Sequence, residues 1–138
     1  DTKVVDSIAN PDFNFKVNVE GTYNLLRAAQ KEGVERFVLA STGGAITGKA
    51  KSPVNESMAP QPLSPYGASK LSAEGYCSAF AGSYGMKTVS LRFSNVYGPF
   101  SNHKNSVVAP FLKISSRVIH YLFMEMVAKQ DVFPILMM

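Results

Sequence analysis

The sequence predicts an α/β fold with a parallel sheet, and the order of its elements carries this prediction. Residues 13–30 and 66–84 have the spacing of helices, residues 37–40 form a short continuous apolar run, and residues 88–93 are predicted to form a second strand. Such runs are typical of strands that are buried on both faces of a parallel sheet. Helices that alternate with them predict a right-handed βαβ crossover.

The first predicted helix begins at Asn10-Pro11-Asp12, because proline suits the first turn and an acid suits the helix dipole. Gly33 supplies the stop. Its predicted buried face contains Val17, Gly21, Leu25, Ala28 and Ala29. Asn18 interrupts this face. A buried amide must find hydrogen-bond partners, so Asn18 is either a core amide or an amide positioned at an active site.

Polar residues follow each predicted strand. Ser41 and Thr42 end the first strand, and Ser94 and Asn95 end the second. The carboxyl ends of parallel strands are where open α/β sheets bind ligands. The glycines after Thr42 are no dinucleotide fingerprint, because we expect the proline-containing loop 49–65 there instead of a helix. Residues 107–114 are expected to begin one more helix.

Tyr66 and Lys70 lie four residues apart at the start of the second helix, so both side chains share one face. An ammonium beside a phenol favours the phenolate and lowers the pKa of the phenol. This pair predicts a general acid/base that works near neutral pH. The alternative is an ordinary Tyr and Lys on a helix surface.

The composition limits the class of protein. The 138 residues are 46% hydrophobic and 17% charged, which describes one soluble globular domain. A net charge of +4 without a basic run gives no indication of nucleic acid, and no apolar segment is long enough for a membrane. Cys77, the single cysteine, is expected to be a buried bystander in a reducing, cytoplasmic protein. The chain begins mid-pattern at Asp1, as expected of a fragment.

Four blocks occur in order: N-V-E-G-T from residue 18, S-T-G-G-A from residue 41, Y-G-A-S-K from residue 66 and L-R-F-S-N-V-Y-G-P from residue 91. Together, over residues 10–112, they resemble the extended short-chain dehydrogenase/reductases. Within these, the nucleotide-sugar epimerases and dehydratases are most similar, above all the UDP-glucose (UDP-galactose) 4-epimerases. The resemblance implies that residues 1–112 form a partial Rossmann-like, doubly wound NAD(P)-binding domain. The N-terminal βαβ unit and most of the substrate domain would be missing.

The resemblance also implies roles at matching positions. Tyr66 would take the proton of a sugar hydroxyl while NAD takes hydride from the same carbon, which gives a 4-keto sugar. Lys70 would lower the pKa of Tyr66 and bind the nicotinamide ribose. Thr42, with Ser41 beside it, would hydrogen-bond the reacting oxygen, and Asn18 and Ser94 would contact the cofactor. Asn95 would contact the diphosphate of the substrate, which is expected to be a UDP-sugar.

The dehydratases usually carry an Asp-Glu pair where this chain has Gly43-Gly44, which favours an epimerase. A 4,6-dehydratase, a reductase or a non-catalytic remnant are the alternatives. NAD is implied by the resemblance alone, because the glycine-rich phosphate turn is absent. We expect the fragment alone to be inactive. The full-length parent is expected to form a homodimer through the helices at 13–30 and 66–84.

The tail, residues 113–138, is interpreted as divergent and out of frame. The family continues with a hairpin that contains I-Y-G-D-G. The codons of residues 123–127 (F-M-E-M-V), read one base earlier, permit that run, and those of Met137-Met138 permit the family's Asp-Asp. A one-base insertion or deletion upstream of about His120 accounts for both. The alternative is an ordinary apolar helix over residues 118–128.

Overall fold

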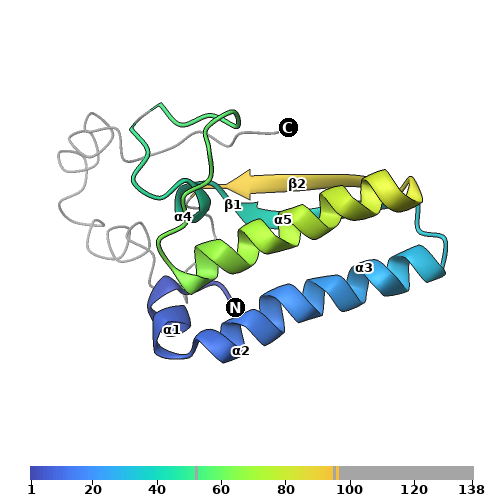
Figure 1. The fold of residues 1–138 in the computed structure, drawn as a ribbon, viewed down its shortest axis with the longest axis horizontal. Coiled ribbons are helices and arrows are strands. Elements are labelled where there is room, and N and C mark those ends of the chain that lie inside the picture. The colour runs from blue at the N-terminus through green and yellow to red at the C-terminus, as the bar shows by residue number, and fades with distance from the viewer. Residues whose placement is uncertain (52, 95, 97–138) are drawn as a thin grey trace, which may run out of the picture. The chain divides into compact units, whose positions relative to one another are not determined.

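Two parallel strands, β1 (Arg36–Thr42) and β2 (Lys87–Phe93), form the sheet, and α5 (Pro65–Tyr84) lies between them in the chain (Figure 1). Their register runs from Arg36 beside Lys87 to Thr42 beside Phe93. The computed structural model describes residues 1–51, 53–94 and 96, of which 1–93 belong to one unit. The predicted parallel α/β arrangement is therefore confirmed. The expected helix at 107–114 and the tail lie outside the described residues, so both stay predictions.

A short helix, α1 (Val4–Ala9), precedes three contiguous helical segments: α2 (Pro11–Phe15), the π-helical η1 (Lys16–Glu20) and α3 (Gly21–Lys31). The predicted start is confirmed, because Asn10 caps α2 by accepting from the Phe13 N–H at 3.1 Å. The predicted stop is also confirmed, since Gly33 has a φ of 69° just after the helix.

The predicted buried face of this helix is wrong at Val17, Leu25 and Ala28, whereas Ala29 packs against the core as predicted. Leu25 is 63% exposed and Val17 is also exposed, whereas Asn14, Asn18 and Leu26 are buried. Asn14, Asn18 and Leu26 are separated by multiples of four, so they form one stripe of the helix, and the buried Val19 lies next to that stripe. Two of them are amides, and for that reason the apolar pattern alone pointed to the neighbouring face.

The core lies between the helices and one face of the sheet. It consists of Leu26, Leu39, Ala73, Cys77, Phe80 and Met86. The helices α3 and α5 run side by side along this face (Figure 1). The prediction that the strand at residues 37–40 is buried on both faces is wrong for the described residues. Side chains alternate along a strand, and Val38, which is 63% exposed, lies beside the exposed Val89 on the other face.

Replacing Leu26 by Ala tests where the core lies. Leu26 is fully buried, so Leu26→Ala should lower the free energy of unfolding by about 2–5 kcal/mol. Leu25→Ala is the matched control, because Leu25 is exposed; it should change that free energy by no more than about 0.5 kcal/mol. Urea unfolding followed by circular dichroism measures both. Equal losses in the two variants would contradict the observed helix face.

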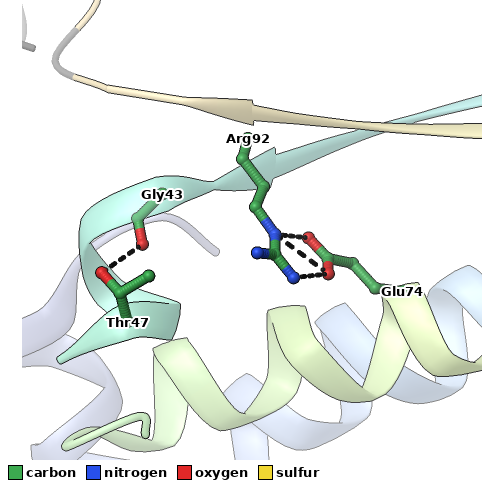
Figure 2. A network of polar contacts seen from close by, with 4 residues as sticks. All are labelled: Gly43, Thr47, Glu74 and Arg92. Atoms are coloured by element: carbon green, nitrogen blue, oxygen red, sulfur yellow. Dashed lines mark hydrogen bonds and ion pairs between the residues drawn. The ribbon is translucent and has the colours of Figure 1, made fainter. Parts of the chain in front are cut away.

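A short helix, α4 (Gly43–Thr47), directly follows β1, where the sequence predicted a loop. Thr47 stabilises it by donating from its hydroxyl to the Gly43 carbonyl at 3.0 Å (Figure 2). Gly48 then turns the chain with a φ of 64°, which favours glycine. Among the described residues, no helix combines the length and hydropathy needed to cross a bilayer.

Candidate active site at the carboxyl edge of the sheet

The first turns of α5 lie at the end of the sheet where both strand arrows point (Figure 1). Ser64 caps this helix by accepting from the Gly67 N–H at 3.1 Å, and Pro65 occupies its first position. The cap fixes where the helix begins. Tyr66 and Lys70 therefore fall in its first two turns, beside the ends of β1 and β2.

The Tyr66 phenol is half-buried and interacts with the Thr42 hydroxyl at the end of β1. Burial raises the pKa of Tyr66 above its ordinary value of 10.0, and hydrogen bonding with Thr42 opposes that shift. The predicted lowering of the Tyr66 pKa by Lys70 is therefore wrong for this chain. Removing the charged phenolate from water costs more free energy than its interactions with polar neighbours recover.

The Lys70 ammonium is turned toward the strand. Its Nζ donates to the Ala40 carbonyl at 3.0 Å. Burial also lowers the pKa of Lys70, because it disfavours the charged amine. Lys70 and Tyr66 thus lie one helical turn apart, with burial favouring the neutral form of each.

The raised pKa of Tyr66 predicts how the phenol ionises. Its ultraviolet absorbance titration, taken as wild type minus Tyr66→Phe, should have a midpoint above 10.0. A raised folded-state pKa contributes stability that is complete below the unfolded value and is lost as pH rises through the folded value. Stability attributable to Tyr66 should therefore fall only in alkaline solution. A midpoint below 10.0 would mean that Lys70, and not burial, dominates.

Asn18 lies in η1, and its buried side chain supports α5. Its Nδ2 donates to the Ser69 hydroxyl at 3.1 Å, and that hydroxyl donates to the Tyr66 carbonyl at 2.9 Å. Single π-helical turns are frequent at functional sites. Asn18 thus fixes the turn that carries Tyr66 and Lys70.

Two further contacts at the start of α5 were missed by the sequence analysis. Ser7, buried in α1, accepts from the Tyr66 N–H at 3.1 Å and donates to the Val4 carbonyl at 2.7 Å. Gly67 lies so close to α4 that a Cβ there would overlap the Ala45 carbonyl. Neither contact has a local sequence signal, because each joins segments far apart in the chain.

The sequence analysis also missed an ion pair that joins β2 to α5 (Figure 2). Nε of Arg92 donates to Glu74 Oε1 at 3.0 Å, and Nη2 donates to Oε2 at 2.7 Å. The side chains are only 19% and 12% exposed. Glu56, from the loop after α4, also acts on Arg92 and, like Glu74, raises its pKa.

The structure separates Ser41 from Thr42. Consecutive strand residues point to opposite faces, and Ser41 is buried. Its Oγ has no hydrogen-bond partner within the described part of the chain. Of the two hydroxyls, Thr42 is thus the one that interacts with Tyr66. Ser94 is half-buried directly after β2, and Asn95 lies outside the described residues.

The chain belongs to the NAD dependent epimerase/dehydratase family, whose sequence model matches residues 2–136. It is 37% identical over 94 residues to the UDP-glucose 4-epimerase of Mycolicibacterium smegmatis, covering 67% of this chain and 30% of that protein. It is also 37% identical over 98 residues to the dTDP-D-glucose 4,6-dehydratase of Mus musculus, covering 71% and 27%.

A solved structure of a UDP-glucose 4-epimerase also matches this chain. The UDP-glucose 4-epimerase of Thermus thermophilus, in complex with NAD, matches with a TM-score of 0.73 and 44% identity. The match covers 83% of this chain and 37% of that one. The chain thus spans well under half the length of each of these three relatives.

Proposed function

We propose that the whole protein that carries this chain is an NAD-dependent 4-epimerase of nucleotide sugars, with UDP-glucose and UDP-galactose as its substrates. The observation that carries the proposal is the interaction of the Tyr66 phenol with the Thr42 hydroxyl at the carboxyl edge of the sheet. Lys70 lies one turn further along the same helix. The similarity to UDP-glucose 4-epimerases supports the choice of substrate.

The residues at this edge fit a nicotinamide ribose. The Lys70 ammonium has three N–H donors, and the Ala40 carbonyl accepts from one of them. The other donors can bind the vicinal hydroxyls of the ribose. Lys70 and Tyr66 would hold the ribose, with Asn18 supporting their helix and Ser94 near the nicotinamide. NAD, when bound there, supplies reversible hydride acceptance.

The chain's own residues would manage the proton. A phenol is already protonated at neutral pH at its ordinary pKa of 10.0, and burial raises the pKa of Tyr66 further, so Tyr66 can donate to a sugar oxygen. In its phenolate form, Tyr66 would accept the proton of the sugar hydroxyl and become the neutral phenol, with the Thr42 hydroxyl beside it to orient the reacting oxygen. Asn95 would contact the diphosphate of the substrate.

A 4,6-dehydratase is the second candidate, because a dehydratase is also among the relatives. Dehydration needs an acid and a base near C5 and C6 of the sugar, in addition to the phenol. In this chain Thr42 is followed by Gly43 and Gly44, which begin α4 and carry no side chain. This local structure favours the epimerase.

The test is to purify the whole protein, release and quantify its bound nicotinamide nucleotide, and supply UDP-galactose. We expect tightly held NAD and formation of UDP-glucose. Failure to turn over either UDP-hexose, with NAD bound, would contradict the proposed substrate. Absence of NAD from folded protein would contradict the proposed cofactor.

We also propose a homodimer formed through α2, α3 and α5. Their apolar side chains Phe13, Tyr76 and Tyr84 are exposed. Tyr23 and Tyr76 stack across α3 and α5 with ring centroids 5.3 Å apart, which joins the two helices into one surface. Equilibrium sedimentation of the whole protein would distinguish this dimer from a monomer.

A further inference from the structure

The ion pair between Arg92 and Glu74 lies beside the proposed acid/base pair but has no part in the chemistry assigned above. Glu74 follows Lys70 by four residues, so the two side chains are neighbours on one face of α5. Side chains on a helix lean toward its N-terminus, which brings the Glu74 carboxylate toward the turn of Lys70. A carboxylate there would normally pair with the ammonium.

The structure gives the carboxylate a different partner. Both of its oxygens accept from Arg92, in a planar two-point contact that lysine cannot reproduce. The Lys70 ammonium instead donates to the Ala40 carbonyl. Arg92 lies beside Ser41 in the sheet register, and Ala40 directly precedes Ser41. The partner of Glu74 on β2 and the partner of Lys70 on β1 are therefore neighbours near the ends of the two strands.

We propose that Arg92 and Glu74 are positioning residues for the acid/base pair. Arg92 occupies the carboxylate that would otherwise draw Lys70 away, and Glu74 neutralises the guanidinium that would otherwise repel it. The consequence for catalysis rests on the proposed function, whereas the electrostatic effect on Lys70 does not.

The charged groups around Lys70 define the expected result. Tyr66 and Glu74 lie on α5 itself, and Arg92 comes from β2. Glu56 acts on Arg92 from the loop. Among the described residues, the Arg92–Glu74 pair combines two opposite charges whose removal, one at a time, should have opposite effects on the pKa of the Lys70 ammonium.

The experiment measures the ionisation of Lys70 in the whole protein. Pulse acetylation with acetic anhydride between neutral and alkaline pH, followed by peptide mass spectrometry, gives the neutral-amine fraction of each lysine. The exposed Lys87 is the internal control. The variants are Arg92→Met, Glu74→Gln, the double variant and Arg92→Lys, which keeps the charge without the two-point geometry. No substrate or cofactor is needed, so an inactive enzyme does not affect the result.

We expect the Lys70 midpoint to rise in Arg92→Met, to fall in Glu74→Gln, and to return close to wild type in the double variant and in Arg92→Lys. At a pH below all midpoints, labelling of Lys70 should drop roughly three- to tenfold in Arg92→Met and increase by a similar factor in Glu74→Gln. Lys87 should not change in any variant.

A merely structural ion pair gives a different pattern. Loosening the contact between α5 and β2 would expose Lys70 to water and raise its midpoint in both single variants. A rise or no change in Glu74→Gln would therefore overturn the proposal. That result is obtained even where Arg92→Met does not fold, because Glu74→Gln keeps a neutral acceptor for Arg92.

Discussion

Tyr66→Phe should reduce epimerase turnover by about 100- to 10,000-fold, the usual contribution of a positioned general acid/base. The substitution removes only the hydroxyl that interacts with Thr42, at the end of β1. The rate constant kcat of the whole protein with UDP-galactose measures the effect. We expect the bound NAD to remain, since Lys70 keeps its place on the Ala40 carbonyl.

Tyr76→Phe is the matched control for this prediction. Tyr76 lies on the same helix, is exposed, and contacts the ring of Tyr23 through its own ring, which the substitution retains. It should leave turnover unchanged. If Tyr66→Phe retained full activity, or if Tyr76→Phe lost as much as Tyr66→Phe, the phenol at position 66 would not be the acid/base.

Gly67→Ala should lower the free energy of unfolding by about 3 kcal/mol or more, because the added Cβ has no room. It would overlap the backbone carbonyl of Ala45 in α4 and lie 3.1 Å from the Cβ of Pro62. The Ala45 contact is to backbone and the Pro62 contact is to a rigid proline ring, which leaves little freedom to adjust. The start of α5 must then move away from α4, and Tyr66 moves with it. Urea unfolding measures the loss.

Gly75→Ala makes the same substitution in the same helix, where nothing lies within 4 Å of the added Cβ. Alanine is the better helix former, so this control should stabilise the protein by about 0.5–1 kcal/mol. Similar losses at the two positions would show that α4 does not approach the first turn of α5 as closely as described.

The elements with local signals could be predicted from the sequence. Ser64 and Pro65 begin α5 and Gly85 ends it, so its bounds differ from the prediction by a single residue. The apolar run at residues 37–40 and the strand predicted at residues 88–93 lie within β1 and β2. The helix α4 was missed because Gly43 and Gly44 are poor helix formers, and its stability comes partly from the Thr47 hydroxyl.

The identity of the candidate site could be predicted, whereas its electrostatics could not. The block from Tyr66 to Lys70 placed both side chains at the sheet edge, as the structure does. The pKa of Tyr66 depends on burial, which a sequence does not display. The contacts of Asn18 with Ser69 and of Arg92 with Glu74 join residues 51 and 18 positions apart, so only the folded chain reveals them.

The most direct test of the proposed chemistry is proton NMR of UDP-glucose and dTDP-glucose incubated with the whole protein in D₂O. An epimerase changes the configuration at C4 and returns the same hydrogen to that carbon. We therefore expect the galactose configuration, with hydrogen retained at C4 and C5. A 4-keto-6-deoxy product with solvent deuterium at C5 would contradict the epimerase and identify a dehydratase.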